Sequence, residues 1–145
     1  MGEPTYDSII IAGERYRLSG GVKEITHEDP GGYSFEKRRH EAIEAAGLAG
    51  YGTRTLKGAP VRDLESLQKV VHQVILHTDM TSDSRGCFNV LVHRGLSTHF
   101  MIDWDGTIYQ GLDVMVEAYH AGEANGGSVG VDMNNPLRNL VREPS

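Results

Sequence analysis

Three stretches decide the fold: Val74-Ile75-Leu76-His77, the segment from Ser97 to Ile108 that reads STHFMIDWDGTI, and Ser128-Val129-Gly130-Val131-Asp132. The first is an apolar run too short for a helix and bounded by polar residues, which predicts a central strand. The second places Asp105-Gly106 between two alternating runs, the strongest short-range signal for a β-hairpin. The third predicts a further strand. Together they indicate a sheet with a histidine at the end of one strand and an acid at the end of another.

Helices are predicted on either side of these strands. Asp63 is a plausible N-cap for a helix from Leu64 to about Val71. Asp83-Ser84 can begin a second helix, which Gly95 would end. A weaker helical pattern, rich in Glu, Lys, Arg and Ala, runs from Phe35 to Ala46. The predicted fold class is therefore α/β, with a mixed central β-sheet flanked by helices.

The first part of the chain has a different pattern. Residues 8–18 predict a β-hairpin that turns at Gly13-Glu14. Several glycines and Pro60 make the stretch after Ala46 irregular. We therefore predict a boundary near Ala59, with an N-terminal flanking module at residues 1–59 and a main domain at residues 60–145.

The composition excludes several classes of function. A formal net charge of -6 over 145 residues argues against nucleic acid as a main partner, because phosphate binding requires a basic surface. The single cysteine, Cys87, excludes an internal disulfide. No apolar stretch reaches the length of a membrane span, and the start of the chain has no signal-peptide pattern. We expect a chain that is cytoplasmic at synthesis, with any delivery to the periplasm or cell wall independent of a signal peptide.

Two of the seven histidines are the best candidates for chemistry. His77 ends an apolar strand, and His120 precedes the small residues Ala121-Gly122, beside which a ligand can approach closely. Catalytic zinc needs three protein ligands, and the spacing in this chain does not reveal a complete set. Cys87 could instead act as a nucleophile with His93, but we interpret it as a small packed residue because no third orienting group is evident.

The same residues show a family resemblance. The motifs are Ile75-Leu76-His77-Thr78, the hairpin from Ser97 to Ile108, Tyr119-His120-Ala121-Gly122, and the segment from Asn125 to Asp132. In this order they resemble the zinc-dependent N-acetylmuramoyl-L-alanine amidases of the type 2 amidase and peptidoglycan recognition protein superfamily. The resemblance covers somewhat under half of the chain. It implies an enzyme that cleaves the amide between N-acetylmuramic acid and L-alanine of peptidoglycan, using a water activated by zinc.

The resemblance also implies roles for single residues. His77 matches the first zinc ligand of the family. Asp132 stands where many members have a glutamate that acts as general base, and its shorter side chain reaches about one methylene less far. His120 and Asn125 would line the substrate groove. Thr98 occupies the position of a tyrosine used by some members and is assigned to substrate binding.

The end of the sequence departs from the family. Two further zinc ligands are expected downstream of Asp132, but residues 133–145 contain no His, Cys or Asp. The interpretation we favour is that this chain is the N-terminal part of a split, processed or truncated amidase, completed by a second polypeptide that supplies the remaining ligands. The alternative is a non-catalytic module that binds peptidoglycan or muropeptides. A third possibility is a misread family, or a metal site made by His77, His99 and His120.

Overall fold

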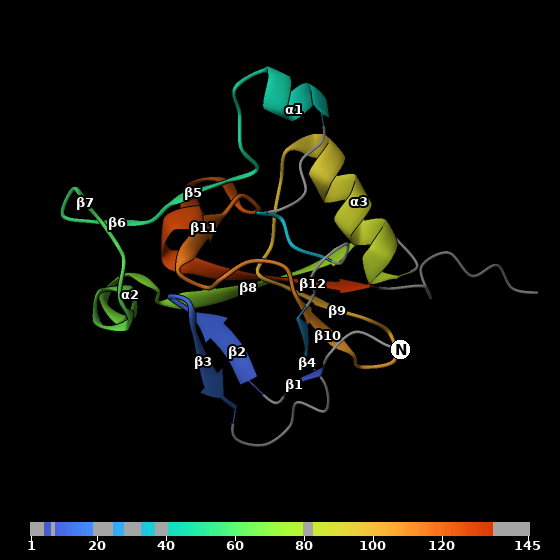
Figure 1. Cartoon of the computed structure of the whole chain (residues 1–145), viewed down its shortest axis with the longest axis horizontal. Coiled ribbons are helices and arrows are strands. Elements are labelled where there is room, and N and C mark those ends of the chain that lie inside the picture. Colours follow the sequence, from blue (N-terminus) through green and yellow to red (C-terminus); the bar gives the residue numbers. More distant parts are fainter. Residues whose placement is uncertain are drawn as a thin grey trace, which may run out of the picture.

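A mixed six-stranded sheet forms the centre of the fold in the computed structural model, which describes residues 5–6, 8–18, 25–27, 33–36, 41–79 and 83–134 (Figure 1). The strands, in spatial order, are β1 (Thr5–Tyr6), β4 (Ile25–His27), β10 (Ile108–Gln110), β9 (Phe100–Ile102), β12 (Ser128–Asn134) and β8 (Gln73–Asp79). β12 runs parallel to both β8 and β9, whereas β9 and β10 form the antiparallel hairpin that Asp105-Gly106 predicted. The register of the parallel pair sets Asp132 of β12 opposite His77 of β8.

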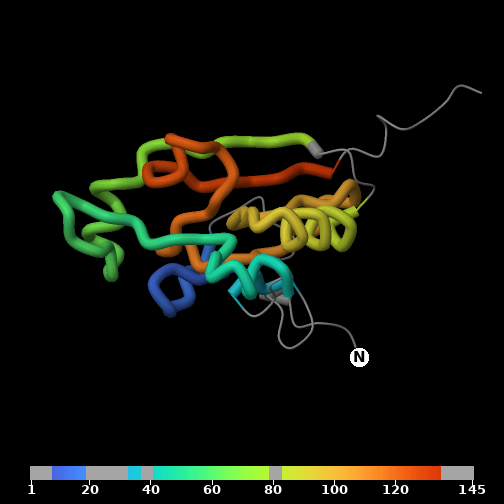
Figure 2. Tube along the Cα trace, turned by 90° about the horizontal axis from the view of Figure 1, so that it is seen from above, coloured from blue at the N-terminus to red at the C-terminus, as the bar shows by residue number. Residues whose placement is uncertain are grey.

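One face of the sheet is covered by α3 (Ser84–Arg94), as Figure 2 shows from above. Both ends of this helix follow the sequence prediction. Asp83 accepts the N–H of Gly86 at 2.8 Å, and Gly95 adopts the left-handed conformation at a φ of 66°, which glycine reaches without strain. The helix packs on the larger core cluster, whose buried members are Tyr33, Phe35, Cys87, Phe88, Met101, Leu112 and Ala118.

The opposite face is covered in part by α2 (Leu64–Val70) and by the N-terminal hairpin. Leu67 of α2 joins Val61 and Val114 in a second core cluster, against which Phe100 and Val129 of the sheet pack. With helices beside both faces, the fold is α/β, with a mixed sheet, as predicted. None of the described helices has the length and apolar character needed to cross a membrane.

The helix α2 begins at the predicted N-cap. The carboxylate of Asp63 accepts the N–H of Ser66 at 2.7 Å, and this bond lowers the pKa of Asp63. We expect Asp63→Ala to lower the free energy of unfolding measurably, because the orphan N–H loses its acceptor. Urea denaturation measures this change, and Asp63→Asn, which keeps a capping oxygen, is the matched control. An alanine variant as stable as the asparagine variant would contradict the prediction.

The N-terminal hairpin consists of β2 (Ser8–Ile11) and β3 (Glu14–Arg17). Its turn is formed by Ala12-Gly13, one residue earlier than predicted, because both adopt positive φ and pair Ile11 with Glu14. The amide side chain of Gln110 bonds both the N–H and the C=O of Ile10, and the carboxylate of Asp113 accepts the two turn N–H groups. The hairpin is thus fastened to the strand β10 and the segment after it.

The stretch between the hairpin and α2 differs from the prediction. Phe35 does not begin a helix: it lies in a turn and is 3% exposed in the core. Residues 37–40 of the predicted helix lie outside the described residues, and α1 is described over Glu41–Ala45. The pattern misled because the aromatic ring is buried by contacts distant in sequence. The region expected to be irregular contains the short strands β5 (Tyr51–Thr53), β6 (Thr55–Leu56) and β7 (Ala59–Pro60).

The position of β8 also corrects the prediction. Among the described residues it pairs with β12 alone and lies at the edge of the sheet, not at its centre. Val74 and Leu76 on this strand are each 61% exposed, so their apolar character does not reflect burial on both faces in the described part of the chain. The domain boundary near Ala59 stays a prediction. β4 pairs with β10, and β5 pairs with β11 (Val116–Ala118), so elements before residue 59 contact elements after it.

Candidate functional site

The candidate site is built around a pair of histidine rings. His77 lies on β8, and His120 lies in the segment between β11 and the 3-10 helix η1 (Gly122–Gly127). The Nε2 atom of His77 is 3.1 Å from the Nδ1 atom of His120, and the two rings meet edge to face with their centroids 5.3 Å apart. These two histidines are 43 residues apart in sequence, and the fold brings together the two that sequence analysis selected.

His120 is held on three sides. Its second ring nitrogen, Nε2, lies 3.1 Å from the hydroxyl of Ser128. The side-chain oxygen of Asn125 accepts the backbone N–H groups of His120 and Ala121 at 3.0 and 2.7 Å. The ring itself lies against Gly130, where an added Cβ would come within 2.9 Å of ring atoms. The imidazole therefore has a defined orientation toward His77.

The electrostatic surroundings keep His120 neutral at pH 7. Burial lowers the pKa of His120 to about 4, and the nearby charges of His77 and Arg54 act in the same direction. A neutral imidazole has one donor and one acceptor nitrogen, which suits its two partners, His77 and Ser128. Binding of a metal ion or a ligand by either nitrogen would replace one of these two hydrogen bonds.

Asp132 lies on the same side of the sheet as His77. The two residues occupy opposite positions on β12 and β8, and side chains at such positions project from the same face. Asp132 is only 6% exposed, and its Oδ2 atom accepts the thiol of Cys87 on α3 at 3.4 Å. Cys87 thus packs in the core as predicted, and it also contacts this carboxylate.

Thr98 is fully buried, and its hydroxyl donates to the carbonyl of Phe100 at 3.4 Å. A buried hydroxyl reaches a substrate only if the surrounding segments open. The assignment of Thr98 to substrate binding stays a prediction, and it requires that these segments open.

Sequence analysis did not predict the burial of two polar residues beside the site, His99 and Arg54. His99 is fully buried: Gly130 donates its N–H to Nδ1 at 3.0 Å, so Nε2 carries the proton and donates to the carbonyl of Val116 at 2.7 Å. Burial lowers the pKa of His99 to about 3. Arg54 is also fully buried, and its Nη2 atom lies 3.2 Å from Nε2 of His99. Nothing in the local pattern around Arg54, a Thr- and Gly-rich stretch, signals this burial.

The described residues do not provide a complete catalytic zinc site. His77 and His120 present two nitrogens at 3.1 Å, but catalytic zinc takes three protein ligands. Within the described ranges, no three side chains of the types His, Cys, Asp and Glu are grouped so that they could hold a metal ion. The proposed set of His77, His99 and His120 is therefore wrong, since both ring nitrogens of His99 are occupied by backbone groups.

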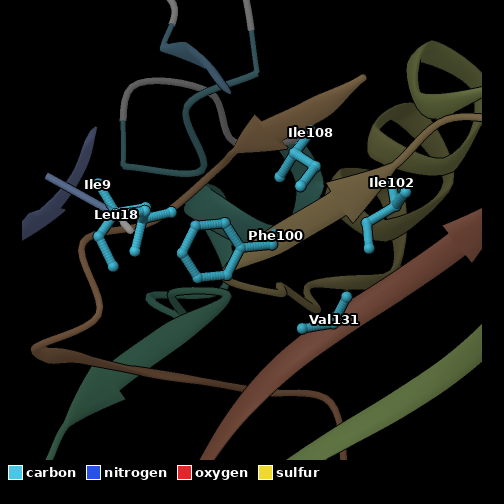
Figure 3. Close-up of a pocket in the computed structure, with 6 residues that line it drawn as sticks. All are labelled: Ile9, Leu18, Phe100, Ile102, Ile108 and Val131. Carbon is cyan, nitrogen blue, oxygen red and sulfur yellow. The ribbon is translucent and has the colours of Figure 1, made fainter. Parts of the chain in front are cut away.

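A cavity of about 250 Å³ lies on the other face of the sheet (Figure 3). It is lined by the apolar side chains Ile9, Leu18, Phe100, Ile102, Ile108 and Val131. Phe100 and Val131 alternate along their strands with Met101 and Asp132, which project toward α3. The cavity is thus separate from the histidine pair and carries none of its polar groups.

Comparisons with known proteins agree with the motifs around this site. A family model described as N-acetylmuramoyl-L-alanine amidase matches residues 67–143, which is slightly more than half of the chain. The match includes His77, Asp132 and the segment from His120 to Ser128. No curated protein and no solved structure matches the chain significantly.

Proposed function

Because the chain belongs to the N-acetylmuramoyl-L-alanine amidase family, we propose that its histidine site binds peptidoglycan fragments and hydrolyses the amide between N-acetylmuramic acid and L-alanine. One observation carries the proposal: His77, His120 and Asp132 project into one region from β8, β12 and the segment between them. That arrangement groups an acid and two imidazoles on one face of the β8–β12 pair, with His77 on the edge strand. Asp132 is only 6% exposed, so its contact with a substrate would require the neighbouring segments to open, as for Thr98.

The proposed roles follow from the chemistry of each group. Asp132 would act as the general base, taking the proton of the attacking water and returning it to the leaving amine. His120 and Asn125 would line the groove, and their mutual hydrogen bond supports a fixed position for both. His77 is our proposed ligand for zinc. The remaining ligands would have to come from outside the described residues.

A second polypeptide that completes the fold remains part of this proposal. Val74 and Leu76 expose apolar surface on β8, which supports a further element at that edge. The alternative function is a muropeptide-binding module without catalysis. It is favoured by the incomplete ligand set among the described residues.

The decisive experiment incubates the natively purified protein, together with any polypeptide that co-purifies with it, and zinc with an N-acetylmuramoyl-L-alanyl peptide and with its D-alanyl diastereomer as control. Mass spectrometry follows the release of N-acetylmuramic acid and free peptide, and calorimetry measures binding. Release from the L-isomer alone is the expected result. Binding without release would support the binding module instead, and the absence of both would contradict both functions.

A further inference from the structure

Arg54 is the most deeply buried charged side chain of the described residues, and its guanidinium donates to four backbone carbonyls in addition to its contact with His99. It lies between β5 and β6 with no exposed surface. Nε donates to Val114 O at 3.1 Å, and Nη1 donates to Asn125 O at 3.2 Å and Gly126 O at 3.0 Å. Nη2 donates to Ser128 O at 2.8 Å. The rigid planar fork of one guanidinium thus ties together the loop after β10, the 3-10 helix η1 and the start of β12.

Burying a guanidinium in this way costs free energy, which its hydrogen bonds must offset. A buried cation loses its hydration, and that burial lowers the pKa of Arg54, while the charge of Glu117 acts in the opposite direction. An apolar side chain could fill the same space without desolvating a charge. The hydrogen bonds therefore indicate that Arg54 serves to fix the relative positions of the segments it joins.

Two of those segments hold His120. Asn125, whose carbonyl accepts from Arg54, uses its side-chain oxygen to bind the backbone N–H groups of His120 and Ala121. Ser128, whose carbonyl also accepts from Arg54, places its hydroxyl 3.1 Å from the ring of His120. Both the backbone and the imidazole of His120 are consequently attached to residues that the guanidinium holds in place.

Residues 50–53, which precede Arg54, also contact the segment that leads to His120. β5 pairs with β11, so Tyr51 lies opposite Ala118, two residues before His120. The hydroxyl of Ser97 donates to the carbonyl of Gly50 at 2.5 Å and accepts the N–H of Tyr119 at 3.0 Å. At Gly52, an added Cβ would lie 2.5 Å from the hydroxyl oxygen of Tyr119. Residues 50–54 therefore form a strap across the segment that leads to His120.

We propose that Arg54 is a positioning residue for His120, and that the strap of residues 50–54 belongs to the functional site although it precedes the family match at residues 67–143. This role of Arg54 in catalysis rests on the function proposed above, but its role in placing His120 does not. The function would require His120 and Asn125 at one fixed separation from His77, and the guanidinium supplies that constraint.

The test compares Arg54→Lys and Arg54→Ala with Arg62→Gln, a neighbouring exposed arginine that serves as control. Amide hydrogen exchange is followed at His120 and Ala121 and, as a reference, at β2 and β3 of the N-terminal hairpin. A long-range nitrogen–proton NMR spectrum reports the ring of His120. We expect Arg54→Lys to speed exchange at His120 and Ala121 by about 10-fold or more relative to the hairpin, since a lysine cannot bridge the same carbonyls. Arg62→Gln should change neither signal.

Chemical rescue sharpens the result. Millimolar guanidinium chloride should slow exchange at His120 and Ala121 in Arg54→Ala, and equal concentrations of sodium chloride or urea should not. Uniform acceleration across the chain, or no rescue and no local change in Arg54→Lys, would overturn the proposal. If Arg54→Ala does not fold, the lysine variant still decides it. If the wild-type chain cleaves no muropeptide, the exchange data still test the positioning role, so the two proposals fail separately.

Discussion

Asp132→Asn is expected to lower the rate of cleavage of the muramoyl–L-alanine amide by about 10²–10⁴-fold, the range typical for loss of a general base. Asparagine has the same shape as aspartate and can still accept the thiol of Cys87, so the packing beneath α3 should persist. It cannot take a proton from water. Affinity for the uncleaved peptide should therefore change by less than about threefold, because the loss is confined to the transition state.

The measurement is steady-state turnover of an N-acetylmuramoyl-L-alanyl peptide, with calorimetric binding and zinc content measured on the same preparation. Glu65→Gln is the matched control, because it removes one exposed carboxylate on α2, distant in sequence from the site. Zinc should stay bound in both variants. Full activity of Asp132→Asn would place the base elsewhere, and loss of binding together with activity would indicate a structural role for Asp132.

The elements defined by local signals were predicted well. The limits of α3 follow from Asp83 and Gly95, and the β9–β10 hairpin follows from Asp105-Gly106. Each signal acts on its own backbone within a few residues, through a cap or a turn conformation. The sequence therefore contains the information at the place where the element forms.

Features set by distant contacts could not be predicted from local pattern. Phe35 is drawn into the core against Phe88, 53 residues later, at a ring-centroid distance of 4.7 Å, and this contact removes it from the predicted helix. The burial of Arg54 depends on carbonyls 60 to 74 residues away. The edge position of β8 depends on strand order, which an apolar run does not specify.

The candidate site lies between these cases. His77, His120 and Asp132 were selected from motif order, but their proximity follows from the register of β12 on β8 and from the bonds that orient His120. Sequence analysis named His99 only as a possible metal ligand. In the structure it is a neutral core residue whose two ring nitrogens bond the backbone of Gly130 and Val116.

Acid is expected to lower the free energy of unfolding at pH values where the carboxylates are still ionised. The reason is that His99 stays neutral in the folded protein but takes up a proton when the chain unfolds. Its pKa is about 3 in the folded protein against 6.5 in the unfolded chain, so the unfolded state binds more protons below pH 6.5. The stability of the fold is therefore unaffected by this group above pH 6.5 and decreases as the pH falls from 6.5 toward 3. Between pH 7 and 4.5 this single group should lower the free energy of unfolding by ~2–3 kcal/mol.

His120, with a pKa of about 4, lowers the free energy of unfolding in the same direction as the pH falls. Backbone hydrogen bonds lower the pKa values of Asp63 and Asp105, so these two groups reduce the stability only below their ordinary pKa of 3.8. Denaturant unfolding at pH 7, 5.5 and 4.5 in the presence of a chelator measures the slope. His99→Gln keeps a donor and an acceptor but does not titrate, so its unfolding free energy should fall less steeply over this range. His93→Gln, at an exposed position on α3, should retain the wild-type slope. Equal slopes for His99→Gln and the wild type would mean that the buried ring is not the group that takes up the proton on unfolding.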